Sequence, residues 1–181
     1  MKNRSNLAQT IILILIFCFL SFVGAKLIVK VAEVPFTLQS LFVLLSGLLG
    51  GPIIGFFSQL LYLCLGWFFP VFSSDTKFGV EAFTAPSAGF LLAFPFVAFI
   101  CGMWNSFTHR FYRLFLIPLT AHTFLFICGI TGLIYIGNLS FDKSFKIGFL
   151  DLALFGYLKC LMATMIAYLF NNRIKGELKG L

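Results

Sequence analysis

Residues 34–72 read VPFTLQSLFVLLSGLLGGPIIGFFSQLLYLCLGWFFPVF, and no charged side chain interrupts this stretch. The uncharged run continues to Ser74, so it covers 41 residues. A helix needs about 20 apolar residues to cross a bilayer, so the run is too long for one crossing. Gly50-Gly51-Pro52 lies at its centre, where glycine permits a turn and proline disfavours helix in the residue before it. The run therefore predicts a hairpin of two helices, at about 38–50 and 53–69.

The composition of the whole chain also indicates a membrane protein. Of its 181 residues, 60% are hydrophobic and 10% are charged, and the mean hydropathy is +1.03. A soluble domain carries about 25% charged residues. The net charge of +7 does not predict nucleic-acid binding, because the basic residues occur singly or in pairs with no patch. The five cysteines are scattered through apolar runs without metal-ligand spacing, so we expect free thiols and no cofactor.

The remaining charges separate four more apolar stretches. The first could be a signal peptide with a cleavage site at Val23-Gly24-Ala25, but we favour a retained span because the apolar part is long. The predicted fold is an all-α membrane protein, a single domain over residues 1–181 with six transmembrane helices at about 5–25, 38–50, 53–69, 86–107, 114–137 and 147–170. Six crossings place both termini on one side, with seven Lys and Arg residues against five on the other. The positive-inside rule then predicts cytoplasmic termini.

Two polar stretches on the predicted outer side are candidates for a ligand site. Residues 34–39 enter the second helix with Thr37 and Gln39 beside a proline, and residues 73–90 carry Ser, Thr, Gly and Pro between the third and fourth helices. Polar groups on such backbone at the mouth of a helix bundle can hold a small molecule. Ordinary helix capping by Thr37 and Thr84 explains the same residues, and on the residues alone we favour capping.

Lys159 lies in the middle of the last predicted helix. A charge at the bilayer centre costs at least about 2.5–3.5 kcal/mol, so we expect this lysine to face the bundle interior and to contact a ligand, although it could instead extend to the interface. Asp151 lies two turns earlier and is poorly placed for a direct ion pair. His122 could carry a proton, but an interhelical hydrogen bond is the commoner role for a lone histidine.

Several catalytic motifs are missing from the sequence. It contains no phosphate-binding GxxxxGK[ST] loop, no HExxH and no GxSxG. ATP hydrolysis by the first motif and the common hydrolase chemistries of the other two are therefore excluded. We predict that the chain is not an enzyme.

The segment at residues 34–94 resembles the BioY family, the substrate-capture (S) components of energy-coupling-factor (ECF) biotin transporters. The family pattern runs V-P-[IF]-T-L-Q-[TS], G-P-x-x-G, L-Y-L-x-L-G, P-V-F and G-P-T-G-G-[YF]-L. The positions of this chain that fit it are Pro35, Thr37, Leu38, Gln39, Gly51, Pro52, Gly55, Tyr62, Gly66, Pro70, Phe72, Pro86, Gly89 and Phe90. Alanines at 85 and 88 replace family glycines, and Gly156 stands where the family has Asp, three residues before its Lys.

The resemblance implies a six-helix S-component-like bundle in the cell membrane that captures biotin from outside. It also implies a separate coupling membrane protein and two ATPase subunits as partners. The substrate-binding residues expected from the resemblance and the residue chemistry together are Thr37, Gln39, Phe72, Ser74, Gly79, Pro86, Ser87, Gly89, Phe90, Asp151 and Lys159. Whether Asp151 replaces the family's Asp is left open.

Other functions remain alternatives at this point. The family's Ala-x-x-x-Ala docking pattern in the first helix is absent, because Ala8 is followed at that spacing by Ile12. A stand-alone biotin facilitator is therefore an alternative, as is an S component for another small vitamin. A small membrane enzyme and an assembly subunit without a ligand are less favoured.

Overall fold

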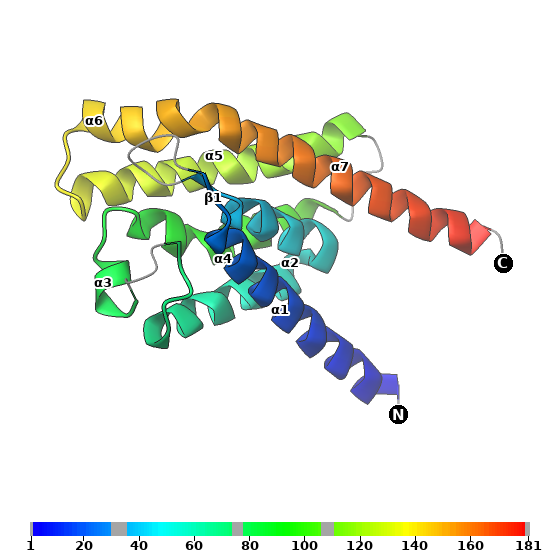
Figure 1. Ribbon diagram of the computed structural model, residues 1–181. Coiled ribbons are helices and arrows are strands. Elements are labelled where there is room, and N and C mark those ends of the chain that lie inside the picture. The colour runs from blue at the N-terminus through cyan, green and yellow to red at the C-terminus, as the bar shows by residue number, and fades with distance from the viewer. Residues whose placement is uncertain (1, 30–35, 74–77, 106–110, 180–181) are drawn as a thin grey trace.

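The computed structural model describes residues 2–29, 36–73, 78–105 and 111–179. The long helices are α1 (Lys2–Lys26), α2 (Gln39–Phe68), α4 (Ala88–Asn105), α5 (Phe111–Tyr135) and α7 (Asp151–Lys179). The short elements are β1 (Ile28–Val29), β2 (Phe36–Thr37), α3 (Val80–Phe83), α6 (Phe141–Phe145) and the π-helix η1 (Lys146–Leu150). The long helices pack as a bundle, with α2 against α1, α4 and α7, and α5 against α4 and α7 (Figure 1).

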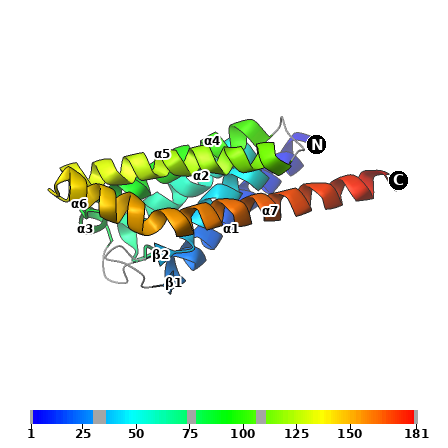
Figure 2. The ribbon, with the colours of Figure 1, turned by 90° about the horizontal axis from the view of Figure 1, so that it is seen from above.

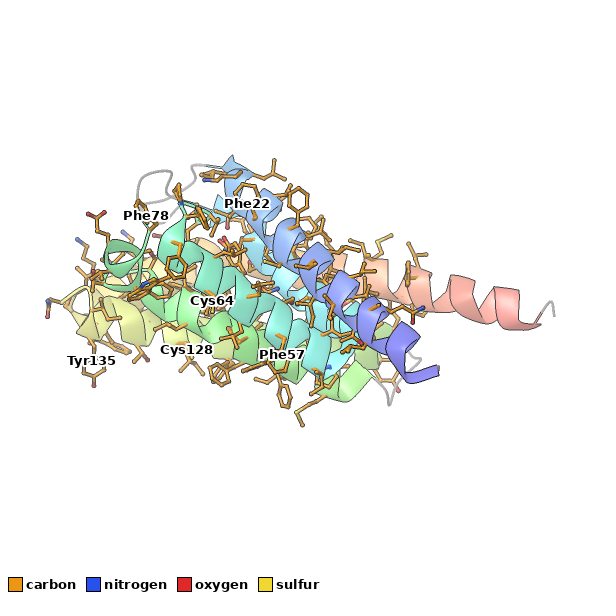
Figure 3. All side chains as sticks on the ribbon, turned by 90° about the horizontal axis from the view of Figure 1, so that it is seen from below. Phe22, Phe57, Cys64, Phe78, Cys128 and Tyr135 are labelled. Atoms are coloured by element: carbon orange, nitrogen blue, oxygen red, sulfur yellow. The ribbon has the colours of Figure 1, made fainter. Side chains whose placement is uncertain are left out.

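The all-helical membrane fold expected from composition is confirmed. Within the described residues, four helical segments are long and apolar enough to cross a membrane: Leu7–Lys26, Gln39–Phe68, Leu114–Tyr135 and Phe141–Phe170. The shorter helix Ala88–Met103 is also apolar. Large apolar side chains, such as those of Phe57 and Tyr135, lie on the outer surface (Figure 3). Such a surface suits hydrocarbon and not water.

Helix α2 is a hairpin that turns at the predicted tripeptide. Gly51 has φ 82° and ψ 178°, a conformation open to glycine and not to residues with a Cβ atom, and Pro52 follows it. Gln39 Nε2 donates a 3.1 Å hydrogen bond to Tyr62 Oη across this break. In a straight helix, 23 residues would span about 34 Å. The two halves of α2 therefore run back along each other.

Buried polar side chains connect the hairpin to α1. Ser21 Oγ of α1 donates to Gln59 Oε1 at 3.1 Å, and Gln59 Nε2 donates to Ser46 Oγ at 3.3 Å and to Ser58 Oγ at 3.2 Å. Without water, buried polar groups need such partners. Gln59 thus bridges α1 and both halves of α2 with polar contacts.

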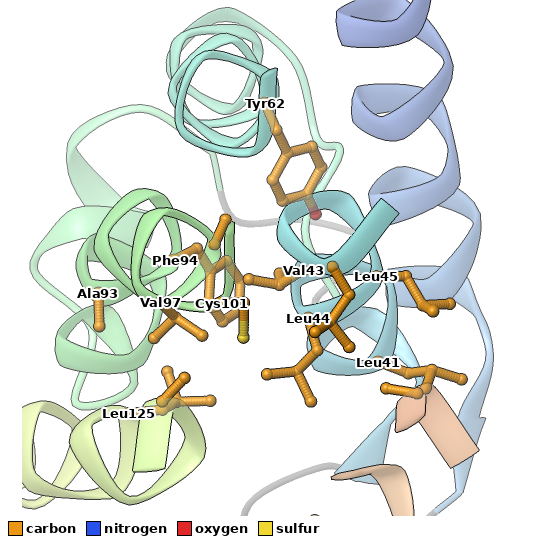
Figure 4. Packing of buried hydrophobic residues seen from close by; sticks show 14 of the residues in the cluster. Leu41, Val43, Leu44, Leu45, Tyr62, Ala93, Phe94, Val97, Cys101 and Leu125 are labelled. Carbon is orange, nitrogen blue, oxygen red and sulfur yellow. The ribbon is translucent and has the colours of Figure 1, made fainter. Parts of the chain in front are cut away.

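The hydrophobic core lies between the first half of α2, α4 and α5. Val43 and Leu44 of α2 face Val97 and Cys101 of α4, and Leu125 of α5 closes this layer (Figure 4). All five side chains are buried. The core therefore fixes the positions of α2, α4 and α5 relative to one another, and these helices form walls of the candidate site.

Two features differ from the sequence-based expectation. The last helical region begins at Phe141, six residues before the predicted start, so Asp142, Lys143 and Lys146 lie on α6 and η1 and not in a loop. Aromatic contacts at i, i+4 favour this extension, since the Phe141 and Phe145 rings stack at 6.0 Å and Phe145 and Phe149 lie 5.3 Å apart. Residues 36–37, expected to enter a helix, instead pair antiparallel with β1.

The chain termini and the short elements lie at different ends of the molecule. The amino end of α1 and the carboxyl end of α7 are at the same end in two perpendicular views (Figures 1 and 2). Helices α3 and α6 lie at the opposite end (Figures 1 and 2). The segments around the short elements contribute to the cavity described next.

Candidate substrate-binding site

A cavity of about 130 Å³ lies between the start of α2, the segments flanking α3, and helices α4, α5 and α7. An engineered apolar cavity of about 150 Å³ binds benzene, so a cavity of this volume can admit a small organic group. The polar residues of its wall are Thr37, Gln39, Ser40, Ser73, Ser87, His122 and Lys159. The apolar residues and glycine are Phe72, Ala82, Ala85, Phe90, Leu91, Phe94, Leu125, Phe126, Leu152 and Gly156.

Lys159 brings a positive charge to this wall. Leu152, Gly156 and Lys159 share one face of α7 because they are spaced four and three residues apart. The lysine is 7% exposed, and its Nζ donates a 2.8 Å hydrogen bond to Ser40 Oγ of α2. An ammonium group has only donors, so Lys159 can bind a carboxylate or a carbonyl oxygen of a ligand.

A chain of hydrogen bonds connects Gln39 to the segment that carries Phe72. Gln39 Nε2 donates to Tyr62 Oη, which donates to the Val71 carbonyl at 2.9 Å. The Phe72 ring packs directly over Gly66, where a Cβ atom would collide with it. Lys26 Nζ donates to the carbonyls of Pro70 and Phe72, each at 3.1 Å. The segment after α2 is therefore fastened to α1 and α2, with Phe72 in the cavity wall.

The structure brings six of the predicted site residues together. The members of this group that line the cavity are Thr37, Gln39, Phe72, Ser87, Phe90 and Lys159. Ser74 lies outside the described residues. The cavity wall does not include the remaining four, which are Gly79, Pro86, Gly89 and Asp151.

Each of these four has another position. Gly79 precedes α3 with φ 56°. Gly89 lies so close to α5 that a Cβ atom would collide with the Cys128 carbonyl, and Pro86 lies beside Gly137. Asp151 begins α7 one residue before Leu152, about 100° around the helix from it. These four residues do not line the cavity, because neighbouring residues point in different directions, and their role in substrate binding stays a prediction.

Sequence reasoning also missed residues of the wall. Ser40 directly follows Gln39, and its bond to Lys159 joins residues 119 positions apart. His122 is 2% exposed and was expected to have an interhelical partner. Its Nδ1 has no hydrogen-bond partner among the described residues. The signal in the sequence was that it is the lone histidine of an otherwise apolar stretch.

The model of the BioY family matches residues 1–176. The chain belongs to the BioY family. It is a multi-pass protein of the cell membrane. The resemblance to the BioY family that is visible at residues 34–94 therefore extends over almost the whole chain.

Relatives within the BioY family cover similar lengths. The probable biotin transporter BioY of Pyrococcus horikoshii is 32% identical over 172 residues, which are 94% of this chain and 98% of that protein. The biotin transporter BioY of Thermotoga maritima is 29% identical over 154 residues, 84% of this chain and 89% of the relative. The crystal structure of an S component for biotin from an ECF-type ABC transporter superposes with a TM-score of 0.84. It shares 20% identity and covers 95% of both chains, which establishes the common fold.

Proposed function

We propose that this BioY-family chain captures biotin on the extracytoplasmic side of the membrane for uptake into the cell. The observation that carries the proposal is the Lys159–Ser40 pair in the wall of a largely apolar cavity. The names of its relatives as biotin transporters support the substrate. A small ligand with an apolar body and polar ends fits such a wall.

Biotin has this chemistry, with a bicyclic body, a ureido group and a carboxylate. In our proposal Phe72, Phe90 and Phe94 cover the apolar body. Lys159 supplies a charge-assisted hydrogen bond to an oxygen of the ligand. Gln39 and Ser87 supply further polar contacts at the cavity wall.

The proposed topology has six crossings with both termini in the cytoplasm. Counting the two halves of α2 separately gives six apolar helical segments, although each half is short for a crossing. The bias of Lys and Arg toward the terminal side supports the orientation. The end of the molecule that carries α3, which contributes to the cavity wall, then faces outside. Accessibility of single cysteines at the exposed residues Lys143 and Glu81 to an impermeant thiol reagent tests this topology.

Energy for uptake would come from other proteins. The sequence has no phosphate-binding loop, and the matched structure is an S component of an ECF-type transporter. We therefore propose a coupling membrane protein and two ATPase subunits as partners and no catalytic activity in this chain. The missing Ala-x-x-x-Ala pattern supports a stand-alone facilitator as the second candidate. Biotin uptake by cells that express only this chain, with and without ATP depletion, separates the two.

The first experiment measures biotin binding to the purified protein in detergent by isothermal titration calorimetry. Wild type is compared with Lys159→Met, Gln39→Ala and a control, Lys143→Met, whose lysine is exposed on α6. Saturable binding that weakens in the first two variants and not in the control supports the proposal. Folded wild-type protein that binds no biotin contradicts it, and other vitamins are then tested.

A further inference from the structure

His122 of α5 is a buried polar residue to which the proposed function assigns no role. Its side chain is 2% exposed and lines the cavity. Its ring packs edge-on against Phe126, with ring centroids 4.8 Å apart. Nδ1 has no hydrogen-bond partner among the described residues. Because Nδ1 is buried and has no partner, the other ring nitrogen, Nε2, is the one that a ligand in the cavity could contact.

Gly156 of α7 makes room for this imidazole. A Cβ atom at position 156 would lie 2.6 Å from His122 Nε2 and 2.7 Å from Phe126 Cζ. Nε2 therefore occupies the space into which a side chain at position 156 would project. Since Gly156 and His122 both line the cavity, Nε2 lies at the cavity wall.

The ring lies close to the lysine of the site. Gly156 precedes Lys159 by three residues, a rise of about 4.5 Å along α7. Both His122 and Lys159 line the same cavity. A carboxylate is absent from the described residues of the wall, so a second positive charge beside Lys159 would be unpaired. The imidazole is therefore neutral, with one N–H donor and one acceptor nitrogen.

We infer that His122 is a specificity-determining contact, in which Nε2–H and Lys159 Nζ donate to the same oxygen-bearing group of the substrate. This inference rests on the proposed biotin capture. A donor at Nε2 leaves Nδ1 as the unpaired atom, and a buried acceptor without a partner is tolerated better than a buried N–H. Biotin carries two such oxygen groups, the ureido carbonyl and the carboxylate.

The experiment combines variants with ligand analogues. His122→Phe keeps an aromatic ring without nitrogens, and His122→Asn restores an N–H donor on a shorter side chain. Each protein is titrated with biotin, with the analogue in which sulfur replaces the ureido oxygen, and with the analogue whose side chain ends in methyl in place of the carboxylate. Monodispersity in detergent and the thermal midpoint establish that each variant is folded.

The expected result is selective. His122→Phe weakens biotin binding about 10- to 100-fold, the effect of losing one buried hydrogen bond. The loss shrinks to less than about 3-fold for the analogue that lacks the contacted oxygen, because that contact is already missing in the wild type. The analogue that shows this smaller loss identifies the oxygen group. His122→Asn recovers part of the affinity for biotin.

A second variant tests the same contact if His122→Phe does not fold. Gly156→Ala keeps the imidazole but displaces Nε2, so it must show the same selective loss. Equal losses for biotin and both analogues overturn the inference and make His122 a packing residue. Wild-type protein that binds no biotin overturns the proposed function itself, an outcome that these variants do not mimic.

Discussion

Lys159 on α7 donates a 2.8 Å hydrogen bond to Ser40 on α2, although 119 residues separate them. The pair joins the last helix to the first half of the α2 hairpin across the cavity wall. Both residues are buried. The charge of the lysine is thus held at one point of the wall and not left to extend toward the membrane surface.

Ser40→Ala is expected to weaken biotin binding about 5- to 10-fold, because the ammonium loses the acceptor that positions it. Lys159→Met is expected to have the larger effect. The double variant should bind about as Lys159→Met alone does, since the serine acts through the lysine. Titration calorimetry of the four proteins checks this. Additive losses would mean that Ser40 contacts the ligand independently.

Gly66→Ala is expected to displace Phe72 from the cavity wall. A Cβ atom at position 66 collides with the Phe72 ring, which cannot stay where it is. We expect a loss of biotin affinity of about tenfold or more, with a lower thermal midpoint. Cys64→Ala, at an exposed position of the same helix, is the control. Unchanged affinity in Gly66→Ala would show that Phe72 does not cover the ligand.

Lys26→Met is expected to increase the dissociation rate of biotin several-fold. Its Nζ bonds to the Pro70 and Phe72 carbonyls, and their loss frees the segment that carries Phe72. Stopped-flow measurement of ligand release compares it with the exposed Lys143→Met control. A dissociation rate equal to that of wild type would show that other contacts are sufficient to hold the segment.

Gln59→Leu is expected to reduce stability more than binding. It removes the acceptor of Ser21 Oγ and leaves this hydroxyl buried between α1 and α2, whereas Ser46 Oγ keeps its hydrogen bond to the Val43 carbonyl. A buried hydroxyl without a partner costs about 1–3 kcal/mol. The thermal midpoint in detergent should fall while the biotin affinity of the folded fraction stays within about 3-fold. A large affinity loss at an unchanged midpoint would place Gln59 in the site.

The segment at 86–90 shows why only some residues of a sequence motif line the cavity. Ser87 and Phe90 line the cavity, whereas Pro86 and Gly89 approach α5. Residues three apart share a helix face and adjacent residues do not. A motif that spans all of these positions therefore includes packing residues together with wall residues. The same geometry separates Asp151 from Leu152 at the start of α7.

The sequence alone determined the membrane class, the turn at Gly50-Gly51-Pro52 and the position of Lys159 inside the bundle. These follow from hydropathy, backbone sterics and the cost of burying a charge, all of which act locally along the chain. The tertiary structure decided which residues meet. Ser40 bonds to Lys159, and His122 occupies the space that Gly156 leaves open. Such contacts depend on how helices distant in sequence pack side by side, which no local pattern encodes.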